Sequence, residues 1–452
     1  MAHPLTLLRA TLGLSQPEYA RLVARTHSNL GLGAMAARRE KVSRWESGRI
    51  APEFTAQLAM AHLHGVPAAE VRRLGWPYWT HLAIQDTVLL EQPYTREGAT
   101  TVLASTTQPT RGPQPRALVL RGAALAGQLR DALARLAGSP SQPPRPLPEE
   151  MAGCVAGIEA RVGALEAQEH GTLLSPAGLY AAAHAEHRLV VSLLTRTGHD
   201  HPAAPQLFAL AARTAMVCGW LGGALGEAAR AERHILAGIR AAAAAGRPSL
   251  AARAMAQLAR HHLVVGEAND AMLLIHAARS ADPRTSEVAT VALHNFEAVT
   301  LARLGRARTA AAALENAGQC LADTPTAADG PLSDGHRLGY QLYLSATAGA
   351  MWWYLDEPRK AGQCFSPITE FLLAPHTTAP LARTAVWLLY TIDTHLALGE
   401  LDVAAEAAHQ AVDLSGTLPP GLAREYRRRL APHQHEPIVH RALDHLNDTG
   451  PV

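Results

Sequence analysis

The sequence predicts an all-α protein, with a small N-terminal helical domain followed by a long helical array. Alanine and arginine are abundant while lysine occurs only at Lys41 and Lys360, and this composition favours helices. From Glu149 onward almost the whole chain shows an amphipathic helical pattern with short breaks. Because 452 residues are too many for one hydrophobic core, we expect separate folded units.

Composition divides the chain into three segments. Residues 1–82 are helical and basic, and we interpret them as the first domain. Residues 83–148 form a connector, with one apolar helix near 116–136 and a proline-rich tract at 138–146 that is typical of a semi-rigid linker. Residues 149–452 are the predicted helical array.

The positive charge is concentrated at the N-terminus. The whole chain carries a formal net charge of +2, whereas residues 1–81 hold ten Arg or Lys and five Asp or Glu, which gives +5. A local basic surface of this kind indicates nucleic-acid binding.

Several classes of protein are disfavoured by the sequence. Cys154, Cys218, Cys320 and Cys364 are scattered without a CxxC pair, so neither a zinc ribbon nor a disulfide framework is predicted. The N-terminus has no secretion signal pattern, and no stretch approaches about 18 uncharged apolar residues, the length that spans a membrane. We therefore expect a cytoplasmic protein.

Neither an enzyme nor a metalloprotein is predicted. GxSxG, Walker and GxGxxG motifs are absent, so we expect no catalytic residues and no cofactor. Histidines cluster at His199-Asp200-His201 and at His433-Gln434-His435, with His440 nearby, but both groups fall in expected loops without an HExxH or Cys/His spacing. We expect no metal site.

A weak repeat runs through the third segment. An alanine follows five residues after each of five helix breaks, and a small or apolar residue follows seven further on. The breaks are Gly226, Gly266, Gly305, Asp356 and Gly399; the alanines are Ala231, Ala271, Ala310, Ala361 and Ala404; the later residues are Gly238, Ala278, Ala317, Ile368 and Ala411. Small residues permit close helix packing, which predicts helical hairpins that stack on their neighbours.

This pattern resembles tetratricopeptide repeats, although the intervals of 40, 39, 51 and 43 residues exceed the usual period of about 34. The resemblance implies a helical solenoid; a generic helical array is the alternative. In such solenoids partners bind on the concave face, so Trp352, Trp353 and Tyr354 are candidates for a ligand face. A buried interface between helices is the competing interpretation of these aromatic residues.

Residues 5–71 carry a second, more specific pattern. Ser15 and Glu18 form an S-x-x-E capping box at the start of a helix, and Gln16 lies between them. Further on, the segment 42–52 reads VSRWESGRIAP, in which Gly48 is placed to end a helix. These residues resemble the helix-turn-helix domain of the Xre family of repressors.

Helical periodicity divides the helix that ends at Gly48, which is the expected recognition helix, into two faces. Val42 and Trp45 lie on one side and are expected to face the core. The opposite side holds the residues expected to contact base edges, which are also the positions that the family uses: Arg39, Glu40, Ser43 and Arg44. Phosphate contacts are expected from Arg38, Lys41 and Arg49 at the margins and, by the resemblance, from Gln16. The alternative is that these charged residues only form a solvent-exposed face of a small helical domain and contact no DNA.

One feature departs from the family. In the family, the helix that begins with the capping box and the recognition helix are joined by a few residues, whereas here residues 24–37 lie between them. The inserted loop either bulges out or touches DNA itself, and the docking angle of the recognition helix stays open.

The resemblance implies a two-part transcriptional regulator that binds double-stranded operator DNA as a homodimer. The array would bind a peptide or small-molecule effector, mediate dimerisation, or do both. Regulators of this layout in high-GC filamentous bacteria control development or secondary metabolism, which we carry over as an expectation. The alternative is a protein-interaction scaffold with a degenerate helix-turn-helix.

Overall fold

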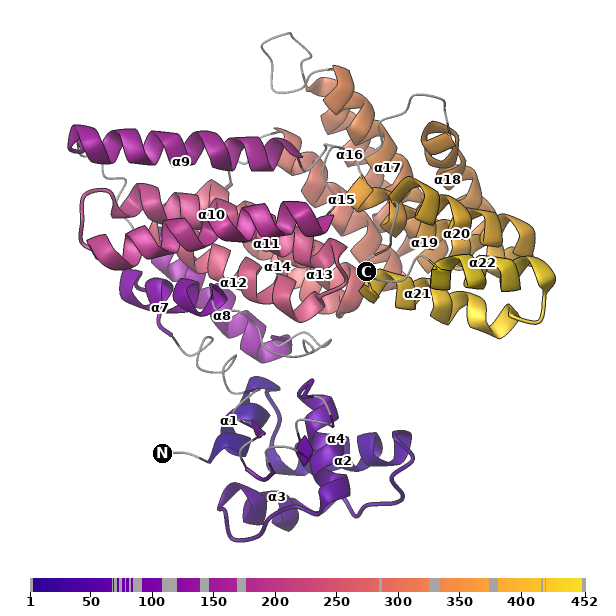
Figure 1. Cartoon of the computed structure of the whole chain (residues 1–452), viewed down its shortest axis with the longest axis horizontal. Coiled ribbons are helices and arrows are strands. Elements are labelled where there is room, and N and C mark those ends of the chain that lie inside the picture. Colours follow the sequence, from indigo (N-terminus) through magenta and orange to yellow (C-terminus); the bar gives the residue numbers. More distant parts are fainter. Residues whose placement is uncertain are drawn as a thin grey trace.

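The computed structural model describes residues 3–66, 68, 71–72, 75–77, 79–80, 83, 92–107, 120–138, 146–168, 176–283, 287–324, 334–373, 381–415, 418 and 420–448. Within these residues every regular element is a helix, as the sequence predicts. Figure 1 shows a small group of helices at the N-terminus and a larger helical body, with α7 and α8 on the side of the larger body that faces the N-terminal helices.

Four helices make up the described N-terminal part: α1 (Pro4–Thr11), α2 (Gln16–Asn29), α3 (Arg39–Glu46) and α4 (Phe54–Leu63). Helix α2 packs on both α3 and α4, and α1 packs on α3. Their shared core draws on residues from Leu5 to Ala83, with Tyr19, Val42 and Trp79 fully or almost fully buried. Burial of these large side chains stabilises helices that are too short to persist alone.

The connector contains two described helices, α7 (Arg96–Thr106) and α8 (Gly122–Ala137), where the sequence analysis expected one. The first was missed because its apolar residues are few and are mixed with threonine and serine. The apolar helix begins at Gly122, and the expected start near residue 116 lies outside the described residues. Both helices belong to the core of the larger body, which buries Val102, Leu103 and Leu125 together with residues of the array.

The array consists of helices that pack mainly on their neighbours along the chain. They are α9 (Glu149–Ala167), α10 (Pro176–Thr197), α11 (Ala204–Ala224), α12 (Ala228–Ala244), α13 (Pro248–Val265), α14 (Ala268–Ala281), α15 (Glu287–Arg303), α16 (Ala307–Asp323), α17 (Asp334–Tyr354), α18 (Pro358–Leu373), α19 (Leu381–Leu398), α20 (Leu401–Ser415), α21 (Pro420–Leu430) and α22 (Pro437–Asp448). From α11 to α19, each odd-numbered helix also contacts the next odd-numbered one. The helices therefore form a continuous stack and not a set of isolated pairs.

The five breaks of the sequence pattern each separate two helices that pack together: α11 and α12, α13 and α14, α15 and α16, α17 and α18, α19 and α20. The alanine that follows each break is completely buried, at 0% exposure in all five cases. Four breaks have a positive φ, including the non-glycine Asp356 at 61°, whereas Gly266 ends its helix with φ −122°. The small side chains let the paired helices approach closely.

Candidate nucleic-acid interface

Helix α3 is short and sharply delimited. Arg38 precedes it in an extended conformation with φ −105° and ψ 127°. After Glu46 and Ser47, Gly48 adopts φ 69°, a left-handed conformation that suits glycine and ends the helix as predicted. The eight residues Arg39–Glu46 therefore form about two turns, with both ends fixed by the backbone.

The two faces of α3 differ as the helical periodicity predicts. Val42 is fully buried, and Trp45 is 5% exposed; both pack into the N-terminal core. The side chains of Arg39, Glu40, Ser43 and Arg44 are all exposed. Helix α3 therefore presents hydrogen-bonding groups to solvent while two large apolar side chains attach it to the domain.

An ion pair holds the end of α3 against α1. The Nε of Arg9 donates to Oε1 of Glu46 at 2.6 Å, and its Nη2 lies 3.4 Å from Oε2 of the same carboxylate. Nη1 of Arg9 also donates to the carbonyl oxygen of Leu14 at 2.6 Å, so the guanidinium joins α1, the turn before α2 and α3. Both charged side chains are largely shielded from solvent, with 17% and 7% of their surface exposed.

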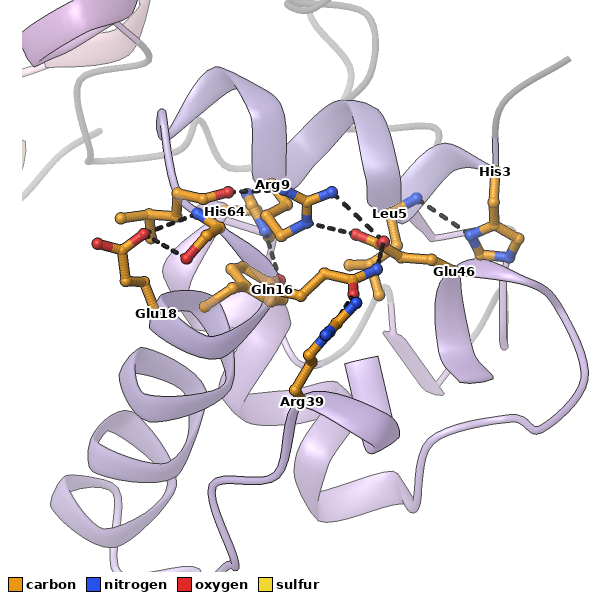
Figure 2. A network of polar contacts seen from close by, with 11 residues as sticks. His3, Leu5, Arg9, Gln16, Glu18, Arg39, Glu46 and His64 are labelled. Carbon is orange, nitrogen blue, oxygen red and sulfur yellow. Dashed lines mark hydrogen bonds and ion pairs between the residues drawn. The ribbon is translucent and has the colours of Figure 1, made fainter. Parts of the chain in front are cut away.

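Gln16, the first residue of α2, connects the two ends of α3. Its Nε2 donates to Oε2 of Glu46 at 2.7 Å, and its Oε1 accepts from Nε of Arg39 at 3.4 Å (Figure 2). The side chain predicted to contact a phosphate is thus half-buried and oriented by two residues of α3. Its position at the N-terminus of α2 also places it where anions are favoured by the helix dipole.

The connection between α2 and α3 is shorter than the sequence analysis expected, because α2 continues to Asn29 and only residues 30–38 lie between the helices. This segment is attached to the domain. The buried ring of His27 donates from Nδ1 to the carbonyl oxygen of Gly33 at 2.9 Å, and Leu32 and Met35 pack against the N-terminal core. The insertion is therefore a fixed loop next to the N-terminus of α3.

The start of α2 has the predicted capping interaction. The carboxylate of Glu18 accepts hydrogen bonds from the backbone nitrogen of Ser15 at 2.8 Å and from its hydroxyl at 2.5 Å. These two bonds lower the pKa of Glu18, because they favour the ionised carboxylate. A negative charge at this position also stabilises the helix N-terminus.

Buried polar pairs fix α4 and the chain that follows it. The hydroxyl of Tyr19 shares a 2.8 Å hydrogen bond with Nε2 of His64, whose pKa falls to about 4 because the ring is buried. Gln57 accepts from the indole nitrogen of Trp79 at 3.1 Å and donates to the carbonyl oxygen of Pro52 at 2.8 Å. Together these bonds hold α4 against α2 and hold the turn that follows α3.

The predicted phosphate contacts surround the exposed face of α3. Arg38 lies directly before the helix and Arg49 directly after its terminating glycine; both are exposed, whereas Lys41 is half-exposed. Glu46 carries the opposite charge but is paired with Arg9. The surface around α3 is consequently basic, and Glu40 is the exposed acidic residue of the helix itself.

Trp352, Trp353 and Tyr354, the candidate ligand face, are each half-buried at the end of α17. Trp352 and Trp353 both pack against the core of the C-terminal helices, and Tyr354 lies under the guanidinium of Arg303 at 5.3 Å. The ammonium of Lys360 covers the ring of Trp352 at 4.5 Å. These contacts are those of side chains between packed helices.

The histidine clusters stay as separate pairs. His199 is 3.5 Å from Asp200, and His435 is 3.5 Å from Glu436. In the part of the chain that the structure describes, no group of three His, Cys, Asp or Glu side chains is arranged to hold a metal ion.

One described helix, α11, is long and apolar enough to cross a membrane, but 78% of its most apolar 18-residue stretch is buried inside the protein.

The partners of Glu46 could not be predicted from the sequence. Arg9 and Gln16 lie 37 and 30 residues away along the chain, and no local pattern pairs them with α3. The anchoring role of His27 was also missed, because a lone histidine near the end of an amphipathic helix has no distinguishing neighbours.

No family model and no curated protein matches the chain.

Proposed function

We propose that this protein is a transcriptional regulator that binds double-stranded DNA in a sequence-specific manner. In this proposal α2 and α3 act as an Xre-type helix-turn-helix, and α3 enters the major groove. The observation that carries the proposal is the division of α3 into a buried face, Val42 and Trp45, and an exposed polar face next to basic side chains. A helix of this kind fits the major groove of B-DNA, which is about 12 Å wide.

The exposed residues match the chemistry of base edges. Arg39 and Arg44 each carry a guanidinium that can donate two hydrogen bonds to guanine O6 and N7, and Glu40 can accept from cytosine N4. Ser43 can donate or accept. We therefore expect a site that contains G·C pairs, with Gln16, Arg38, Lys41 and Arg49 contacting phosphates.

The helical array would supply assembly or sensing. Its stacked helices and buried alanines support a tetratricopeptide-like solenoid, a form that presents extended surfaces to partners. We propose that two copies associate, since helix-turn-helix dimers read two half-sites about one helical turn apart. An effector peptide or small molecule would act by binding one arrangement of the dimer more tightly than another.

Selection of bound duplexes from a random library by the full chain, followed by titration of the best duplex at several salt concentrations, tests the proposal. Specific binding should fall steeply with salt, because phosphate contacts release counterions. The double substitution Arg39→Ala and Arg44→Ala should reduce affinity and relax the preference at the contacted bases, by about 1–3 kcal/mol for each contact.

The matched control is the double substitution Arg424→Ala and Arg441→Ala, which removes the same charge from exposed positions of α21 and α22. If both double variants bind every duplex like the parent protein, the recognition role of α3 is wrong. If no duplex is enriched at all, the chain is better explained as a protein-interaction scaffold.

A further inference from the structure

Few residues separate the described N-terminal helices from the larger body. The last described residue of the N-terminal core is Ala83, and the next described residue, Gln92, already belongs to the larger body. The eight residues 84–91 lie between them, and a chain of this length spans at most about 30 Å. The point at which residues 92–95 are held therefore limits where the N-terminal helices can lie.

We call residues Gln92–Thr95 the entry turn; it is bound by a buried arginine of α12. Arg240 is 1% exposed, and its Nη1 donates to the carbonyl oxygen of Gln92 at 2.5 Å. Its guanidinium lies 4.2 Å from the centre of the Tyr94 ring, and its Nη2 donates to Oε1 of Gln128 in α8 at 2.5 Å. One side chain of the array thus joins the entry turn to α8.

The buried surroundings of Arg240 make the loss of its hydrogen bonds to Gln92 and Gln128 costly. Burial lowers the pKa of the guanidinium, and the nearby Tyr94 and Asp131 oppose this effect. A buried charge that loses its partners is costly, so Arg240 favours the arrangement in which the entry turn stays in place. The same burial raises the pKa of Tyr94 to about 12, so its ring stays neutral.

On its other side the entry turn packs closely against Gly98 in α7. A Cβ atom on this residue would lie 2.3 Å from the carbonyl oxygen of Pro93, so only glycine fits. The hydroxyl of Thr95 accepts from the backbone nitrogen of Gly98 at 3.1 Å and starts the helix. The turn is therefore packed directly on the first turn of α7.

The far end of α7 is attached to the array as well. Thr106 shares a 2.8 Å hydrogen bond with Nε2 of His187 in α10, and its carbonyl oxygen accepts from His184 at 3.2 Å. Helix α7 is thus held at both ends and packs on both α10 and α12. In Figure 1 this helix lies between the N-terminal helices and the array.

We propose that the entry turn is an anchor, built by Arg240 and Gly98, which fixes the point where the chain from the DNA-binding helices joins the array. Any displacement of α12 then carries Arg240, and with it the entry turn. The DNA-binding part of this inference rests on the proposed function, whereas the anchor itself does not.

Distances between spin labels in the full chain test the anchor. One label is placed on Ser28→Cys in α2 and the other on the native Cys154 of α9, both exposed, with Cys320 and Cys364 replaced by alanine. Arg240→Met removes the hydrogen bonds and Gly98→Ala displaces Pro93, so both should broaden the distance distribution. Gly127→Ala on α8 is the control, because its Cβ would meet no atom within 4 Å.

Two independent variants are used, so that one can still be interpreted if the other misfolds. Thermal unfolding followed by circular dichroism identifies a variant in which the array is unfolded. A folded Gly98→Ala or Arg240→Met chain with the same narrow distribution as the parent would overturn the anchor. Broadening in both variants, but not in the Gly127→Ala control, supports it.

DNA binding gives a second measurement. If the anchor positions two DNA-binding domains, its variants should lose on the order of tenfold in affinity for a duplex with two half-sites and keep their affinity for a single half-site. Equal affinity of variants and parent for both duplexes would overturn this role of the anchor. Absence of DNA binding by the parent chain would instead refute the proposed function, while the label distances still decide the anchor.

Discussion

Glu46, the last residue of α3, accepts a 2.6 Å hydrogen bond from Nε of Arg9 in α1, and the two side chains are 7% and 17% exposed. Through Gln16 the same carboxylate is linked to Arg39 at the opposite end of α3. The position of the helix is consequently set by charged groups as well as by the buried Val42 and Trp45. This arrangement gives a direct test of how α3 is held.

Glu46→Ala should loosen α3 without removing any exposed residue of its polar face. The guanidinium of Arg9 would be left half-buried without its main partner, which costs about 2 kcal/mol in the stability of the N-terminal core. Hydrogen exchange at the amides of α3 should therefore accelerate. Glu53→Ala, an exposed carboxylate before α4 whose side chain caps no backbone group, is the control and should leave that exchange unchanged.

Removal of a phosphate contact should be distinguishable from removal of a base contact. Arg49→Ala should weaken binding to all duplexes alike and reduce the slope of affinity against salt by about one. Arg44→Ala should instead change which base is preferred. Equilibrium titrations with the best duplex and its single-base variants measure both effects, and a change of base preference in Arg49→Ala would contradict the assignment.

The close contact between α11 and α12 predicts a steric effect at Gly219. A Cβ atom there would lie 2.5 Å from Cγ1 of Ile235 and 3.2 Å from the carbonyl oxygen of Ala231. We expect Gly219→Ala to lower the free energy of unfolding by about 1–3 kcal/mol, because α12 must move. Urea unfolding measures this loss, and Gly153→Ala on α9, which meets nothing within 4 Å, should show none.

The buried ring of His187 predicts acid sensitivity at the contact between α7 and α10. It bonds to Thr106 at 2.8 Å and to Thr214 at 2.9 Å, and burial lowers its pKa from 6.5 to about 3. The folded protein therefore keeps the ring neutral, whereas the unfolded chain takes up a proton below about pH 6.5. The resulting stability is complete above pH 6.5 and is lost progressively as the pH falls toward 3.

At pH 5 this loss amounts to about 2 kcal/mol, at roughly 1.4 kcal/mol for each pH unit. The urea concentration at the midpoint of unfolding should therefore decrease when the pH is lowered from 7.5 to 5. His187→Leu should make this decrease smaller. His435→Leu, an exposed ring, is the control. An unchanged pH dependence in His187→Leu would show that other groups carry it.

Much of the local structure was predictable from the sequence. The capping residues Ser15 and Glu18, the terminating Gly48 and the buried positions Val42 and Trp45 follow from short-range rules, because each depends on neighbours within one or two helical turns. The five alanines of the repeat pattern are buried for the same reason: a small residue at a fixed distance after a helix break lies where two adjacent helices meet.

Contacts between distant residues were decided only by the tertiary structure. The sequence alone determined that the chain is helical, that a basic segment comes first and which residues of α3 face outward, since periodicity and composition act locally. Packing determined that Arg9 pairs with Glu46, that His27 holds the inserted loop and that Arg240 binds the entry turn 148 residues earlier. Such pairs form because buried charges and donors must find partners wherever the fold brings them together.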